Sequence, residues 1–211
     1  MSEKYKNPAV TVDIVIFSIL NEALNVLLIK RKSPPYENCR AIPGGFVEYN
    51  ESIEEAALRE LEEETGIENI YLEQLHSFGT LGRDPRGRTI SVAYFALLNS
   101  HNLKIKAKSD AKEAAWFSLK ELPELAFDHN DILSCAIESL RLKLENFPVA
   151  KELLPEYFTL IQFQNLYEII LNRKIDEGRF KCEILKMDFI EKTGPHVYGF
   201  KKDISFSSRF Y

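Results

Sequence analysis

Cysteine is scarce in this sequence. The 211 residues include three, Cys39, Cys135 and Cys182, which lie far apart and have no paired spacing. An odd number of cysteines at such distances argues against both a disulfide framework and a structural zinc site. We therefore expect free thiols and a reducing, cytoplasmic environment.

Long apolar runs are also absent. The first one, from Ala9 to Leu20, contains Asp13 and is too short to cross a bilayer. The start of the chain lacks the basic segment and small-residue cleavage site of a signal peptide, so we expect no membrane partner. The formal net charge is −5, which excludes a general electrostatic attraction to nucleic acid. With 45% hydrophobic and 28% charged residues, the composition is typical of a folded protein with a real core.

The first two-thirds of the chain mixes strand and helix patterns. Alternating or β-branched segments predict strands near 10–16, 25–29, 70–79, 89–98 and 115–117, with a turn at Asn21-Glu22. The Pro- and Gly-rich segments 33–35 and 43–45 indicate a loop region. Apolar residues at helical spacing predict helices over 52–65 and 128–144. In the first of these, Ser52 and Glu55 form a capping box and Gly66 is the stop signal.

The helix over 52–65 gathers acidic side chains. Glu60, Glu63 and Glu64 stand at positions i, i+3 and i+4, so their carboxylates share one face. Like charges packed together repel, and a hard cation such as Mg²⁺ or Mn²⁺ between them removes that cost. Metal held there would polarise a diphosphate and lower the pKa of a bound water. The alternative is a solvated acidic face, which is the usual meaning of such a run.

Spacing decides between these interpretations. The pattern is Gly45, five residues, Glu51, seven residues and then Arg59-Glu60-Leu61-Glu62-Glu63-Glu64-Thr65-Gly66-Ile67. It resembles the Nudix box at every fixed position. The resemblance implies an α/β (α+β) fold, the Nudix α/β/α sandwich around a mixed sheet. It also implies Mg²⁺- or Mn²⁺-dependent cleavage of a nucleoside diphosphate linked to another group.

Residue roles follow from the same resemblance. Glu60, Glu63 and Glu64 correspond to metal ligands, with Glu64 assisting the nucleophilic water and Gly44 offering its carbonyl. Arg59 and Glu51 correspond to residues that orient the catalytic loop. Family members often recruit another carboxylate as base or ligand, and two candidates precede Trp116, with loop solvation as an equal alternative. These are Asp110 and Glu113.

The run from Gly82 to Tyr94 resembles a stretch of Nudix proteins linked to ADP-ribose and NAD metabolism. Its arginines suit phosphate or ribose-phosphate groups, and two further arginines flank the expected site, although each is more often a plain surface residue. The five candidates are Arg31, Arg40, Arg83, Arg86 and Arg88. The leading substrate is ADP-ribose, cut to AMP and ribose 5-phosphate.

The last third follows a different pattern, which divides the chain into domains 1–148 and 149–211. Thr159 and Gln162 cap one helix, a second starts at Asp176, and Gly194-Pro195 separates two strands. Helix, turn, helix and hairpin is the order of a winged helix-turn-helix. The segment 153–186 resembles the winged helix of Nudix-related transcriptional regulators of NAD or sugar metabolism, which implies a DNA partner and a homodimer.

Charge supports DNA binding only modestly. From residue 150 onward there are ten Lys or Arg against nine Asp or Glu, whereas residues 1–149 have seventeen against twenty-three. The candidate phosphate contacts are Arg179, Lys181, Lys186, Lys201 and Lys202. A winged helix used only for packing or dimerisation is the alternative.

Two functions of different class therefore remain. The first is a Mg²⁺-dependent Nudix hydrolase acting on ADP-ribose. The second is a regulator that senses ADP-ribose or a related metabolite and binds DNA. The complete box favours chemistry, since sensing alone needs no catalytic glutamates.

Overall fold

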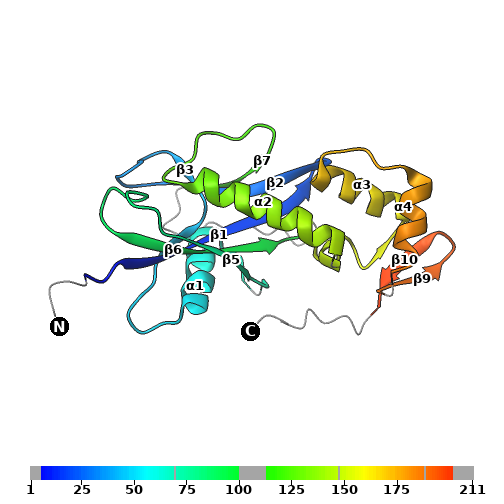
Figure 1. Cartoon of the computed structure of the whole chain (residues 1–211), viewed down its shortest axis with the longest axis horizontal. Coiled ribbons are helices and arrows are strands. Elements are labelled where there is room, and N and C mark those ends of the chain that lie inside the picture. Colours follow the sequence, from blue (N-terminus) through cyan, green and yellow to red (C-terminus); the bar gives the residue numbers. More distant parts are fainter. Residues whose placement is uncertain (1–5, 69, 100–112, 147, 188, 202–211) are drawn as a thin grey trace. The chain divides into compact units, whose positions relative to one another are not determined.

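The structure is a computed structural model that describes residues 6–68, 70–99, 113–146, 148–187 and 189–201. Its contacts divide the chain into two compact units, Met1–Ser139 and Leu140–Tyr211. The division falls inside one long helix, α2 (His129–Asn146), whose first half belongs to the first unit (Figure 1). Within the described residues, no helix is long and apolar enough to cross a membrane.

The first unit is built on a seven-stranded mixed sheet. Its strands are β1 (Ala9–Leu20), β2 (Ala23–Lys30), β3 (Arg40–Ala41), β4 (Gly44–Phe46), β5 (Glu73–Phe78), β6 (Thr89–Leu97) and β7 (Ala114–Ser118). The main order is β3-β2-β1-β6-β5, with β4 on β1 and β7 on β2. β1 and β6 run parallel, and the other pairs run antiparallel. The predicted mixed sheet is thereby confirmed.

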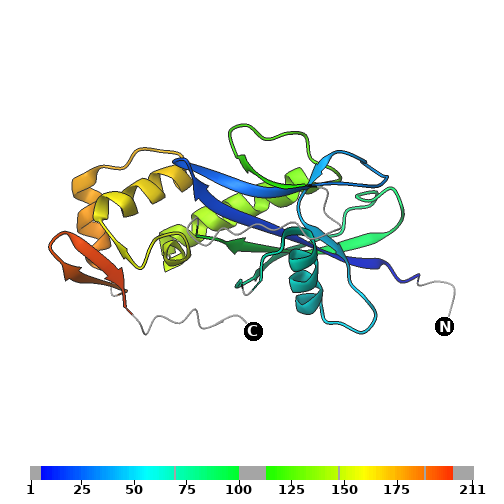
Figure 2. The same cartoon turned by 180° about the vertical axis from the view of Figure 1, so that it is seen from behind.

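Helices cover both faces of this sheet. Val12, Ile14 and Ile16 of β1 pack in one apolar cluster with Ala57 and Leu61 of α1 (Ile53–Thr65). Because side chains alternate along a strand, Asp13 points to the opposite face, where it lies 3.4 Å from His129 at the start of α2. Figures 1 and 2 show the sheet between α1 and the first half of α2. This arrangement confirms the α/β/α sandwich.

Local signals at the ends of α1 are those expected from the sequence. Ser52 accepts a hydrogen bond from the Glu55 N–H, while the Glu55 carboxylate accepts one from the Ser52 N–H. Gly66 ends the helix in the left-handed conformation, at φ 72°. The turn at Asn21-Glu22 also has positive φ at both residues, which joins β1 and β2 as a tight hairpin.

One expectation is wrong. The segment 43–45 was predicted as loop, but Gly44 and Gly45 begin β4, which pairs with Asp13 and Val12 of β1. A Cβ on Gly44 would lie 2.1 Å from the Val12 carbonyl oxygen, and φ is +155°. Glycine is therefore required here for close backbone approach, not for a turn.

The second unit is a small winged helix. It contains the end of α2, the 3-10 helix η2 (Pro148–Glu152), β8 (Tyr157–Phe158), α3 (Leu160–Leu171), α4 (Glu177–Ile184), β9 (Ile190–Gly194) and β10 (Val197–Phe200). The three strands pair in the order β8-β10-β9. Thr159 and Gln162 form the expected capping box, and Asp176 caps α4. Aromatic rings fill its core, with Phe163 in contact with Phe158, Tyr167 and Phe180.

Candidate functional site

Arg59 ties the glutamate helix to the loop before it. Its Nε and Nη2 donate to the two Glu51 carboxylate oxygens at 3.0 and 2.7 Å, and Nη2 also donates to the Phe46 carbonyl at 3.0 Å. Glu51 in turn accepts a hydrogen bond from the Glu48 N–H. These bonds hold the pKa of Glu51 at about 2. The orienting role expected for Arg59 and Glu51 thus has matching geometry.

Glu60 lies directly against the glycine pair. An added Cβ on Gly45 would sit 2.2 Å from its Oε1. Arg59 Nη1 donates to the same oxygen at 2.8 Å and lies 3.5 Å from Glu63 Oε2. Burial raises the pKa of Glu60 despite this arginine. Gly45 is therefore the residue that leaves room for this carboxylate.

The Glu64 side chain contacts the backbone of β4. Its Oε2 accepts the Gly44 N–H at 2.8 Å. Burial raises the pKa of Glu64 to about 8, and the nearby negative charges of Glu60 and Asp13 act in the same direction. The positive charge of Arg31 opposes this rise without cancelling it, and a divalent cation beside the three carboxylates would stabilise the ionised form of Glu64.

The donor set fits a hard cation. Carboxylate oxygens are the ligands that Mg²⁺ and Mn²⁺ prefer, and Glu60, Glu63 and Glu64 supply them from one helix. In the described part of the chain, no three His, Cys, Asp or Glu side chains already have the geometry of a metal site. Arg59 holds two of these glutamates in the structure.

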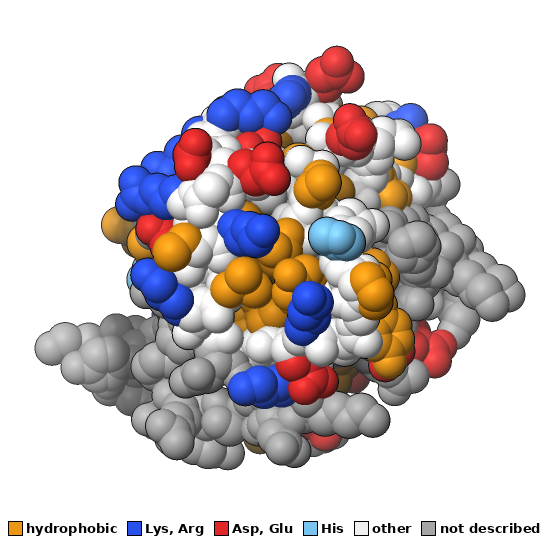
Figure 3. Space-filling model, turned by 90° about the vertical axis from the view of Figure 1, so that its right-hand side faces the viewer, with side chains coloured by type: hydrophobic (Ala, Val, Ile, Leu, Met, Phe, Trp, Pro, Cys, Tyr) orange, Lys and Arg blue, Asp and Glu red, His pale blue; other side chains and the backbone are white. Residues whose placement is uncertain are grey.

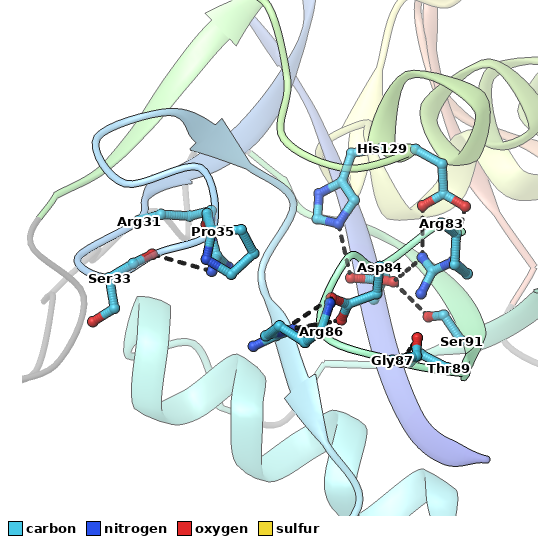
Figure 4. Close-up of polar contacts among 12 residues, drawn as sticks. Arg31, Ser33, Pro35, Arg83, Asp84, Arg86, Gly87, Thr89, Ser91 and His129 are labelled. Carbon is cyan, nitrogen blue, oxygen red and sulfur yellow. Dashed lines mark hydrogen bonds and ion pairs between the residues drawn. The ribbon is translucent and has the colours of Figure 1, made fainter. Parts of the chain in front are cut away.

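A buried polar network lies on the opposite face of β1. Arg83 donates to both carboxylate oxygens of Asp128, at 2.8 and 2.6 Å, and lies 3.5 Å from Asp13. Ser91 donates a short hydrogen bond to Asp13. His129 Nδ1 accepts the Ile42 N–H at 2.9 Å, and burial lowers the pKa of this histidine. Figure 4 shows Arg83, Ser91 and His129 converging from three segments.

Asp13, Asp128 and His129 were not predicted as site residues. Their partners are 45 to 87 positions away in sequence: Arg83 and Ser91 bond to Asp13, Arg83 also bonds to Asp128, and Ile42 bonds to His129. The one available signal is Asp13, a charged residue inside an otherwise apolar strand.

Two of the five candidate arginines lie over the same aromatic ring. The guanidinium carbons of Arg31 and Arg86 lie 4.6 and 5.5 Å from the centroid of Phe127. Arg86 also lies 5.0 Å from the Phe46 ring and pairs with Asp84. Figure 4 shows Arg31 beside Ser33 and Pro35, and Arg86 beside Asp84 on the loop at 83–89.

The other three candidate arginines are separate from this cluster. The side chain of Arg83 is 5% exposed and belongs to the buried network. Arg40 pairs with Glu113 at 3.5 Å and lies over the Phe117 ring. Arg88 donates to the Gly79 carbonyl at 2.6 Å. Of the two extra carboxylate candidates, Glu113 therefore has an arginine partner, and Asp110 lies outside the described residues.

Basic candidates of the second unit lie on or just after α4 and directly after β10, the last strand of the β9–β10 hairpin that forms the wing. Arg179, Lys181, Lys186 and Lys201 are exposed, and Arg179 pairs with Glu183 one turn along α4. Lys202 lies outside the described residues. Figure 3, which views the right-hand side of Figure 1, shows Lys and Arg side chains spread around an apolar area rather than gathered in one patch.

Comparisons with known proteins match a family model to each of the two parts of the chain. The NUDIX domain model matches residues 9–135, and the model of the NrtR DNA-binding winged helix domain matches residues 150–202. An ADPR responsive transcriptional repressor, NtrR of Acinetobacter baylyi, is 37% identical over 193 residues, which is 90% of this chain and 77% of that protein.

Two further relatives match one or both parts of the chain. An ADP-ribose pyrophosphatase of Methanocaldococcus jannaschii is 45% identical over 129 residues, 61% of this chain and 73% of that protein. The crystal structure of Shewanella oneidensis NrtR complexed with a 27mer DNA has a TM-score of 0.75 and 32% identity, covering 91% of this chain and 93% of that one. The chain belongs to the Nudix family and carries a C-terminal winged helix domain of the NrtR type.

Proposed function

We propose that this protein is a transcriptional regulator whose Nudix domain binds ADP-ribose and whose winged helix binds DNA. The observation that carries the proposal is the presence of both parts in one chain, matched over 90% of its length by an ADPR responsive repressor. Arg31, Arg86 and the glutamates of α1 supply charge suited to a diphosphate and its metal. Three free cysteines fit a cytoplasmic location.

DNA contact is assigned to α4 and the wing. In winged helix proteins the second helix of the motif enters the major groove, and basic side chains around it contact phosphates. The residues proposed for this role are Arg179, Lys181 and Lys186 on or just after α4 and Lys201 after β10, with Lys202 next in the sequence. A homodimer would present two such helices to paired half-sites.

The second candidate function is hydrolysis of ADP-ribose. A specific observation favours it, since the Nudix box is complete and Arg59, Glu51, Glu60 and Glu64 are held in an ordered arrangement. Mg²⁺ or Mn²⁺ held by Glu60, Glu63 and Glu64 would supply charge neutralisation and lower the pKa of a water. Glu64 takes a proton from the water as its oxygen bonds to one phosphorus, the bond from that phosphorus to the bridging oxygen breaks, and AMP and ribose 5-phosphate leave. The two functions are compatible in one protein.

The regulator proposal is tested by binding measurements with the full chain. We expect ADP-ribose to bind by calorimetry, and DNA from upstream of the neighbouring operon to bind more tightly than random DNA at physiological salt. Lys181→Ala should weaken DNA binding and leave ADP-ribose binding unchanged. Equal affinity for operon and random DNA would refute the regulator.

Hydrolysis is tested separately by release of AMP from ADP-ribose with Mg²⁺. Glu64→Gln should reduce the rate by more than about a hundredfold, in the range found when a general base is removed. Glu121→Gln, an exposed glutamate outside the box, is the matched control. Undetectable AMP from the unaltered protein, or full activity in Glu64→Gln, would reject the enzyme.

A further inference from the structure

Phe127 has an unusual backbone conformation for a bulky residue. Its φ is 55°, in the left-handed region that L side chains rarely adopt. The preceding residues are anchored to β3, where the Ala126 N–H donates to the Arg40 carbonyl at 2.8 Å and Leu125 forms a bridge to Arg40. Such strain persists only where the surroundings fix it, and it is concentrated at functional sites.

Side chains from three segments of the chain contact the Phe127 ring. Tyr36 approaches it edge-on at 4.8 Å and His129 lies 5.4 Å away. The guanidinium groups of Arg31 and Arg86 lie over it at 4.6 and 5.5 Å. One ring therefore positions two cations that belong to different loops, through cation–π contacts.

Hydrogen bonds within the protein fix the orientation of both guanidinium groups. Asp84, almost fully buried, accepts Arg86 Nε at 3.0 Å and Nη2 at 2.7 Å, as well as the Arg86 backbone N–H. Arg31 donates Nε to the Pro35 carbonyl at 3.0 Å and Nη2 to the Ser33 carbonyl at 3.3 Å. Within the described chain, neither Nη1 has a hydrogen-bond partner.

Of the two arginines at the Phe127 ring, only Arg86 forms an ion pair within the described residues. Arg86 is paired with Asp84, whereas the described residues place no carboxylate within ion-pair distance of Arg31. Burial lowers the pKa of Arg31, and the positive charge of Arg86 adds to this effect. The negative charge of Glu64 acts on Arg31 in the opposite sense, so the cluster lies near the Nudix glutamates. An anionic group bound beside Arg31 would supply the missing charge.

We propose that Phe127 is a positioning residue that holds Arg31 and Arg86 as a two-pronged clamp for the diphosphate of a nucleoside diphosphate ligand. Asp84 fixes the second prong. The inference rests on the proposed binding of ADP-ribose, and it adds the residues that orient the clamp. Phe127 acts through the arginines and does not stack on the base.

Calorimetry with the full chain tests this role, with ADP-ribose, inorganic pyrophosphate and adenosine as probes. Phe127→Leu should weaken ADP-ribose and pyrophosphate binding about tenfold, equivalent to roughly 1.4 kcal/mol. Phe127→Trp, which keeps an aromatic face, should retain most of the affinity. Tyr157→Leu, an exposed aromatic residue of β8, is the matched control and should leave binding unchanged.

A double-mutant cycle separates positioning from general structural damage. If Phe127 acts through the two arginines, then Phe127→Leu should have little further effect in an Arg31→Ala/Arg86→Ala background. Additive losses would overturn the proposal, as would a selective loss of adenosine binding, which indicates direct stacking. If the unaltered protein fails to bind ADP-ribose, the proposed function fails. If it binds and Phe127→Leu binds equally well, only this inference fails.

Discussion

Replacing Arg83 is expected to damage stability far more than a surface arginine would. Its guanidinium makes two hydrogen bonds with Asp128 and lies 3.5 Å from Asp13, and its side chain is 5% exposed. In Arg83→Met, the buried Asp13 and the partly buried Asp128 lose their cation. Removing one partner of a buried ion pair generally costs about 3–5 kcal/mol. For a unit of this size, we expect the melting temperature to fall by on the order of 10 °C.

Trp116 provides the assay. It is the one tryptophan of the chain and packs against the core of the first unit, so its fluorescence reports urea unfolding of that unit. Arg88→Met, on the same loop and bonded to one carbonyl, is the control and should lose less than about 1 kcal/mol. If Arg83→Met were as stable as this control but bound ADP-ribose weakly, Arg83 would contact the ligand and the structural role would be refuted.

Three further outcomes are expected. Gly45→Ala should reduce metal-dependent hydrolysis at least tenfold with unchanged circular dichroism, because its Cβ would displace the Glu60 carboxylate. The free energy of unfolding should fall as pH drops below about 6.5, because His129 in the unfolded chain binds a proton there while the folded one, with its lowered pKa, stays neutral. Urea unfolding at pH 8 and pH 5.5 measures this loss, which should be smaller in His129→Gln. Lys181→Ala should lower the slope of log DNA affinity against log salt by about one, measured by anisotropy across a salt series.

Local sequence signals predicted much of the fold. The Ser52–Glu55 and Thr159–Gln162 capping boxes specify helix starts within a few neighbouring residues, and both form as expected. The box glutamates were found for the same reason, because a helix places positions three and four apart on one face. Ser52, Glu55 and Glu60 therefore needed no information about distant contacts.

Long-range arrangements were not accessible in this way. The parallel pairing of β1 with β6 joins Ala9 to Thr89, and nothing in either segment specifies that partner. The same holds for the Phe127 cluster, whose members come from loops near 31, 86 and 127. Sequence identified Arg31 and Arg86 as basic residues, but only the fold shows that they share a ring.

The most direct test of the account is the coupling between its two ligands. Affinity of the full chain for operon DNA should be measured with and without saturating ADP-ribose, and ADP-ribose affinity with and without DNA. We predict that each ligand shifts the affinity for the other by the same factor, about tenfold or more, since coupling free energies are reciprocal. Two affinities that are each independent of the other ligand would contradict the account.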